Sequence, residues 1–297
     1  MDVDLIGCPM DLGQTRRGVD MGPSALRAAL LEKRIEALGH NLHDLGDLDI
    51  PEVETRKLKD PQLRYMEEIV RACEVLAKKV EKCARSGHFP LVVGGDHSIV
   101  MGTMAGLVKS RGPQGLIYID AHGDFNTMDT TPSGNIHGMG LSACLGLGHP
   151  KLVNIGGVAP KVKAENVALI GVRELDEGEK QLIKKSDIYV ATMRHVDEKG
   201  IHKVMKEAIE HVKDGTRGVH VTFDVDVLDP SEAPGTGTPV PGGLTFREAH
   251  LALEILAERN VATSFELVEV NPLLDERNVT ADLAVSLVES VLGKTIL

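Results

Sequence analysis

The sequence contains no tryptophan, and aromatic residues make up only 3% of its 297 residues, so we expect a core that is mainly aliphatic. No apolar run approaches the roughly 20 residues that a membrane-spanning helix needs. The first residues also lack the basic flank and long apolar stretch of a secretory signal peptide. We therefore expect a cytoplasmic protein with no membrane partner.

Cysteine is scarce and scattered. The four cysteines lie at positions 8, 73, 83 and 144, and no two of them form a C-x-x-C pair. This spacing does not fit the dense disulfide framework of small secreted proteins. We expect reduced thiols.

Positive charge is also in short supply, with 33 lysines and arginines against 44 acidic residues and a formal net charge of -11. Nucleic acids and anionic membranes bind clustered basic side chains, so neither is expected as a partner. A cationic small molecule fits this charge better.

Apolar runs typical of buried strands alternate with amphipathic helical patterns along the chain. Strands are predicted at residues 3–7, 41–45, 91–94, 116–119, 167–172, 188–191, 219–223 and 262–270. Helices are predicted at 24–38, 61–87, 99–109, 199–212, 246–257 and 280–292. The alternation predicts an α/β fold, a three-layer α/β/α sandwich with a mainly parallel sheet. Without repeats or linkers, residues 1–297 are expected to form a single domain.

One apolar run, residues 116–119, leads into three ionisable residues at alternate positions, Asp120, His122 and Asp124. Alternate residues of a strand share one face, so these side chains are expected to project together. Three ionisable groups on one buried face are costly unless their charge is compensated. A metal ion is the simplest compensation.

Two other strand-like runs end in similar groups. Residues 219–223 lead into Asp224 and Asp226, and residues 91–93 lead into a glycine turn that carries His97. In open α/β sheets, ligands bind outside the carboxyl ends of the strands. The three runs therefore predict one shared site.

The candidate metal ligands comprise four carboxylates, two imidazoles and no thiolate. This set favours hard ions such as Mn(II) over structural zinc. Two dications held roughly 3.5 to 4 Å apart would lower the pKa of a bridging water towards about 7, which makes hydrolysis the expected chemistry. The ligands are His97, Asp120, His122, Asp124, Asp224 and Asp226.

Two further residues have both a chemical and a structural interpretation. His137 could shuttle a proton or be an ordinary loop histidine. Glu269 follows another strand and could bind a planar cation, or it could cap a turn or pair with Arg277. Arg16 and Arg17 fit solvent-exposed or intersubunit roles.

The remaining histidines, which include His40, His43, His88, His202 and His211, are interpreted as surface or helix residues.

Four motifs together resemble the signatures of the ureohydrolase superfamily and, within it, of the arginase family. The similarity extends from Gly7 almost to the C-terminus. The motifs are Gly94-Gly95-Asp96-His97-Ser98, Asp120-Ala121-His122-Gly123-Asp124, Phe223-Asp224-Val225-Asp226 with Asp229-Pro230, and Glu269-Val270-Asn271-Pro272.

The resemblance implies an arginase/deacetylase-like fold and a manganese-dependent amidinohydrolase with two Mn(II) ions per subunit. It assigns one ion to His97, Asp120, Asp124 and Asp224. It assigns the other ion to Asp120, His122, Asp224 and Asp226. Hydroxide would attack the guanidinium carbon, with Asp124, His137 and Glu269 as catalytic residues. His137 would be the proton shuttle, and Glu269 would face the guanidinium.

The resemblance also implies L-arginine as the substrate and a homo-oligomer, either a trimer or a hexamer. Asn126, Thr131, Ser133 and Asn135 match positions that bind the α-carboxylate. Asp176 and Glu179 match positions that bind the α-amino group, and Thr238 matches another residue of the site. From spacing alone, Asp176 and Glu179 also fit a solvated helix start.

Four alternatives remain at this stage. Agmatine lacks an α-carboxylate, so an agmatinase need not keep the residues between Asn126 and Asn135. Another guanidino-compound ureohydrolase is a second possibility, and a two-metal phosphoesterase or amidohydrolase is a third, although no phosphate-binding glycine loop is present. The fourth is a catalytically silent metal-binding scaffold, which would need neither His137 nor Glu269.

Overall fold

All eight strands lie in one sheet, in the order β2-β1-β3-β8-β7-β4-β5-β6, in a computed structural model that describes residues 1–296. Every strand pair within these residues is parallel, as predicted. The strands are β1 (Asp2–Cys8), β2 (Asn41–Asp47), β3 (Phe89–Gly94), β4 (Gly115–Ile119), β5 (Val167–Val172), β6 (Tyr189–Thr192), β7 (Val219–Asp224) and β8 (Ala262–Val268).

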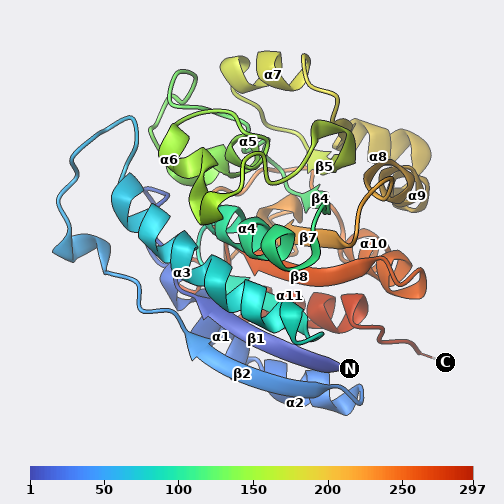
Figure 1. Cartoon of the computed structure of the whole chain (residues 1–297). Coiled ribbons are helices and arrows are strands. Elements are labelled where there is room, and N and C mark those ends of the chain that lie inside the picture. Colours follow the sequence, from blue (N-terminus) through green and yellow to red (C-terminus); the bar gives the residue numbers. More distant parts are fainter. Residues whose placement is uncertain (297) are drawn as a thin grey trace.

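Helices cover both faces of the sheet, which confirms the three-layer sandwich (Figure 1). One core lies under α1 (Gly22–Ala28), α2 (Leu31–Ala37), α8 (Met193–Lys199), α9 (Ile201–Val212), α10 (Phe246–Glu258) and α11 (Val279–Val291). The other lies under α3 (Met66–Arg85), α4 (Val100–Arg111), α5 (Gly140–Cys144), α6 (Pro150–Val153) and α7 (Glu177–Ile183). Among residues 1–296, no helix has the length and apolar character that crossing a bilayer requires.

Strands β3, β4, β5 and β7 are buried along their whole length, as strands covered on both faces must be. This burial explains why each reads as a nearly continuous apolar run. Strand β2 lies at one edge of the sheet and is mostly exposed or half-buried. The carboxyl ends of the central strands therefore open at one rim, between the helices of the two faces.

The strand predicted at 262–270 ends at Val268, and helices α6 and α8 were not predicted. Three further differences concern the segments 24–38, 61–66 and 124–148. The helix predicted at 24–38 is two helices, because Leu30 adopts a left-handed conformation with φ of +64°. The helix predicted from residue 61 begins at Met66, after Tyr65 with φ of +52°. The loop expected between residues 124 and 148 contains the 3-10 turn Ile136–Met139 and helix α5. Apolar periodicity does not register a single left-handed residue, so it could not find the first two breaks.

Candidate active site

The residues after β4 and β7 form the same turn. The carboxylate of Asp120 accepts a hydrogen bond from the backbone N–H of His122 at 2.6 Å. The carboxylate of Asp224 accepts one from the backbone N–H of Asp226 at 2.8 Å. Each turn folds the chain back at the end of a buried strand. Each therefore directs two ionisable side chains to the same rim of the sheet.

The prediction that Asp120, His122 and Asp124 project from one face of a strand was wrong. Strand β4 ends at Ile119, so Asp120, His122 and Asp124 lie beyond it and do not share a strand face. Asp124 has a φ of +48°, in the left-handed region. The turn, and not strand alternation, brings the three side chains together.

The ring of His97 faces three carboxylates. Its Nδ1 atom lies 3.0 Å from Asp120 Oδ2 and 3.3 Å from both Asp124 Oδ2 and Asp224 Oδ2. His97 is fully buried, and it starts the turn that follows β3. One imidazole nitrogen thus lies within 3.3 Å of three carboxylate oxygens.

A second set of ligand atoms lies beside the first. His122 Nδ1 is 2.9 Å from Asp226 Oδ2 and 3.5 Å from Asp120 Oδ1. Asp120 therefore turns one oxygen to each histidine. Two groups of metal-binding geometry result, His97 with Asp120 and Asp224, and Asp120 with His122 and Asp226. The shared carboxylate is the arrangement that a bridged pair of cations needs.

The charge of this cluster fits two dications. Burial and the charge of Asp120 raise the pKa of Asp124 to about 7. Burial together with the charges of Asp226 and Asp120 raises the pKa of Asp224 well above its ordinary value. Burial opposes the charged form of His97, but its contacts with Asp120 and Asp224 outweigh burial and raise its pKa. Without cations, protons would have to neutralise the site, whereas oxygen and imidazole donors at these positions suit hard divalent ions.

A polar chain supports His97 from behind. His97 Nε2 donates to Thr222 Oγ1 at 2.8 Å, and Thr222 donates to Glu266 Oε1 at 3.0 Å. Thr103 donates to the other oxygen of Glu266. These contacts leave the lone pair of His97 on Nδ1, which faces the carboxylates, as in the carboxylate–histidine–metal arrangements of metalloproteins.

Sequence reasoning missed this chain and also missed Tyr118. The Tyr118 ring stacks on His97 with centroids 4.3 Å apart, and its hydroxyl donates to Asp124 at 2.6 Å. A signal was present, because Tyr118, Thr222 and Glu266 are polar residues inside buried segments of the strands. They occupy matching positions on the neighbouring strands β4, β7 and β8.

Replacing Glu266 by glutamine is expected to weaken cation binding 10- to 100-fold, because Gln places an N–H₂ or a weaker acceptor against Thr222. Competition for Mn(II) with a fluorescent chelator measures this affinity. Glu68→Gln is the matched control, since Glu68 is also buried but pairs with Arg71 on α3. Equal affinities for wild type and Glu266→Gln would refute the supporting role.

Glu269 holds His137 in place. Its Oε1 atom lies 3.0 Å from His137 Nδ1 and accepts the backbone N–H of His97 at 3.0 Å. Its Oε2 atom accepts from Gln14 Nε2 at 3.0 Å, a partner that sequence reasoning missed. Glu269 is fully buried with φ of +66°, and its ion-pair partner among the described residues is His137, not Arg277.

The Glu269 contact decides the charge of His137. Burial favours the neutral imidazole, but the hydrogen bond to Glu269 and its negative charge outweigh burial and raise the pKa of His137 to about 9. The contact with Glu269 therefore favours the protonated form of His137. A charged imidazole at this position can give a proton to a leaving amine.

The predicted substrate-binding residues other than Glu269 lie around one cavity, together with His137. Its wall also contains Gly138 and four of the candidate metal ligands. Glu269, His97 and Asp120 lie behind this wall. The cavity is lined by His122, Asp124, Asn126, Thr131, Ser133, Asn135, His137, Gly138, Asp176, Glu179, Asp224, Asp226 and Thr238.

Asp176 and Glu179 have a structural role as well as a place in the cavity. Glu179 accepts the backbone N–H groups of Asp176 at 2.8 Å and Phe125 at 3.0 Å, which caps α7 and ties it to the loop after β4. Asp176 accepts from the Asn126 side chain at 2.9 Å. The helix-start interpretation therefore holds together with a position in the cavity, and Glu179 is buried, not solvated.

The other predicted substrate-binding residues also form hydrogen bonds around the cavity. Thr238 donates to Asp226 Oδ2 at 3.0 Å, which links the loop after β7 to a candidate ligand. Thr131 accepts the backbone N–H of Gly134 at 2.9 Å, and Asn135 accepts from Thr15 at 3.1 Å. Hydroxyl and amide groups thus line the cavity together with the carboxylates of Asp176 and Glu179.

Comparisons with known proteins agree with this geometry. The family model described as "Arginase family" matches residues 1–293. The arginase of Bacillus caldovelox is 54% identical over 296 residues, 99% of each chain, and the arginase of Brevibacillus brevis is 51% identical over 100% of this chain and 99% of its own. A solved structure of the Bacillus caldovelox enzyme superposes with a TM-score of 0.96 over 99% of both chains.

Proposed function

The chain belongs to the arginase family, and from this premise we propose that it hydrolyses the guanidinium group of L-arginine to L-ornithine and urea. The observation that carries the proposal is the convergence of five histidine and aspartate side chains on two positions beside one cavity, with Asp124 next to His97. The amide and hydroxyl groups of residues 126–135 line that same cavity.

The six residues would hold two Mn(II) ions. His97, Asp120, Asp124 and Asp224 would hold the first, and Asp120, His122, Asp224 and Asp226 the second. Carboxylates and imidazoles without a thiolate favour this hard ion. When bound, the pair supplies a hydroxide nucleophile at neutral pH and fixes its position.

Side chains of the protein would bind and position the substrate. Asn126, Thr131, Ser133 and Asn135 would bind the α-carboxylate through amide and hydroxyl groups, while Asp176 and Glu179 would accept from the α-ammonium group. These contacts, with Thr238 at the rim, would place the guanidinium carbon against the nucleophile.

His137 would protonate the departing amine as the bond from carbon to nitrogen breaks. Glu269 orients His137 through the 3.0 Å contact between Glu269 Oε1 and His137 Nδ1. Its Oε2 atom accepts from Gln14, so Glu269 would accept from the guanidinium only after Gln14 releases this oxygen. Asp124 would be a metal ligand and would also lie next to the guanidinium group of the substrate.

The proposal includes a single domain over residues 1–297, a cytoplasmic location and a homo-oligomer, either a trimer or a hexamer. One continuous sheet supports the single domain. The net charge of -11 supports a cationic substrate and no nucleic-acid partner.

Urea release by chelator-stripped protein reloaded with Mn(II) tests the proposal, with L-arginine and agmatine assayed separately. We expect no activity without metal, activity on L-arginine after reloading, and little on agmatine, which lacks the carboxylate. Activity on agmatine alone would indicate an agmatinase. Inactivity on both substrates, with metal bound, would favour a silent scaffold.

A further inference from the structure

A second group of metal-binding side chains lies at the opposite end of the sheet, at the amino ends of β1, β2 and β3. In β1, Val3 and Leu5 pack into the core under α1 and α2, so Asp2 and Asp4 face the other side. His43 is in register with Asp4. His88 precedes β3 directly and aligns with Asp2, because Phe89 pairs with Val3.

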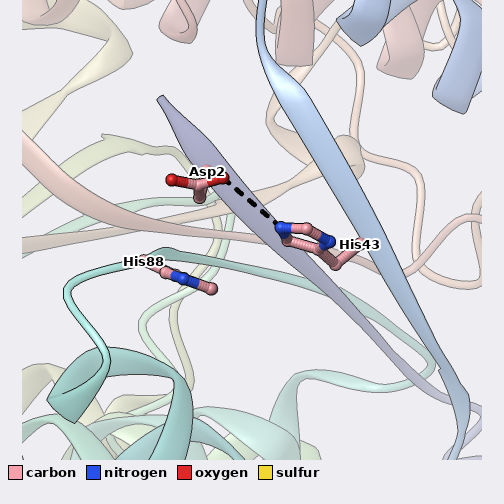
Figure 2. A group of neighbouring side chains, drawn as sticks. All are labelled: Asp2, His43 and His88. Atoms are coloured by element: carbon pink, nitrogen blue, oxygen red, sulfur yellow. Dashed lines mark hydrogen bonds and ion pairs between the residues drawn. The ribbon is translucent and has the colours of Figure 1, made fainter.

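The register therefore places three potential ligands on one face of three adjacent strands. Figure 2 shows Asp2 and His43 pointing toward each other with His88 beside them. Their ligand atoms all lie within 4.8 Å of one another. His43 Nε2 is 3.4 Å from Asp2 Oδ1. Tetrahedral Zn(II) with bonds of about 2.0 to 2.1 Å separates its ligand atoms by about 3.3 Å, so this pair already has the required spacing.

From this geometry we propose that Asp2, His43 and His88 form a binding site for a divalent transition metal such as Zn(II). The site is separate from the candidate active site and does not depend on the proposed activity. Two imidazoles and one carboxylate suit a borderline ion of this kind. Water would complete the coordination, because all three side chains are partly exposed.

In the His43 tautomer that carries its proton on Nδ1, the lone pair on Nε2 is available for binding. Asn41 Nδ2 lies 2.8 Å from Asp2 Oδ1 and 3.2 Å from His43 Nε2, so one amide donor contacts both acceptors. A cation can replace this donor, since both acceptors already point toward a centre of positive charge.

His88 has a carboxylate partner of its own. Its Nδ1 atom lies 2.8 Å from Asp4 Oδ1, and Asp4 is buried. With Nδ1 donating to Asp4, the lone pair resides on Nε2, which is the nitrogen that binds a cation. Arg111 donates to the backbone carbonyl of His88 at 3.0 Å and fixes the segment before β3. A bound ion would tie the amino ends of three strands together.

Equilibrium dialysis of the Mn(II)-loaded protein against Zn(II), followed by metal analysis, tests the site. We expect the wild type to bind one Zn(II) per chain more than His43→Gln or His88→Gln. His202→Gln is the matched control, since His202 is an exposed histidine on α9, and it should bind as the wild type does. Zn(II) could also exchange into the active site, but this exchange is the same in the wild type and the three variants. It therefore cancels when their Zn(II) contents are subtracted.

Two further measurements locate the ion. Asp4→Asn keeps all three ligands and is expected to weaken Zn(II) binding 10- to 100-fold. Zn(II) should also raise the melting temperature of the wild type more than that of His88→Gln, because the ion binds only the folded protein. Retained Mn(II)-dependent activity shows that each variant is folded. Equal Zn(II) content in wild type, His43→Gln and His88→Gln would overturn the proposal.

Discussion

Replacing Asp224 by alanine is expected to remove nearly all urea release from L-arginine, by about three orders of magnitude or more, or roughly 4 kcal/mol of transition-state stabilisation. One oxygen of Asp224 lies 3.3 Å from His97 Nδ1, and the other accepts the backbone N–H of Asp226. The substitution therefore removes a proposed bridge and the turn that orients a further ligand.

Asp224→Asn separates these two effects. Asparagine keeps an oxygen that can accept the Asp226 N–H but lacks the negative charge, so it should preserve the turn and still lose metal. Metal analysis after dialysis measures bound Mn(II), and Asp187→Ala, an exposed substitution elsewhere, is the control. An Asp224→Ala protein with full metal content and wild-type turnover would refute the bridging assignment.

Replacing His137 by alanine is expected to lower kcat about 10²- to 10⁴-fold, the range that a general acid contributes. Glu269 favours the protonated form of His137 by raising its pKa to about 9. It also lines the cavity next to the candidate ligands without belonging to them. Bound Mn(II) should therefore stay the same while turnover falls.

Added imidazole should restore part of the lost rate, because it can enter the space that the side chain vacates and donate the same proton. Steady-state kinetics with and without imidazole measures this rescue, and His202→Ala serves as the control. Unchanged turnover in His137→Ala, or a loss of rate caused entirely by a loss of metal, would contradict the proton-shuttle role.

Much of the candidate site was predictable because buried parallel strands are apolar along their length. Against that background, Asp120 and Asp224 stand out as charged residues where apolar runs end. The sheet then brings such ends to one rim, so six ligands could be named before their geometry was known. The cavity also contains the predicted residues from Asn126 to Asn135, although their contacts with a substrate remain predictions.

The rest depends on contacts between distant parts of the chain. Gln14 contacts Glu269 across 255 positions, and neither residue has a local pattern that predicts the other. Glu266 is a single charge inside a buried strand, and its partners come from α4 and β7. His43 and His88 were interpreted as ordinary surface or helix residues. Only the register of three strands places them beside Asp2.

The position of β8 has a consequence for synthesis. This strand is the last one within residues 1–296, yet it lies between β3 and β7 in the middle of the sheet. A ribosome that adds ~5 to 20 residues per second needs roughly 8 to 34 seconds to make the segment from the end of β3 to the start of β8. Through that interval the nascent chain presents an unpaired apolar strand edge to its surroundings. Chaperones that shield such edges would act on this chain until residues 262–268 emerge and close the sheet.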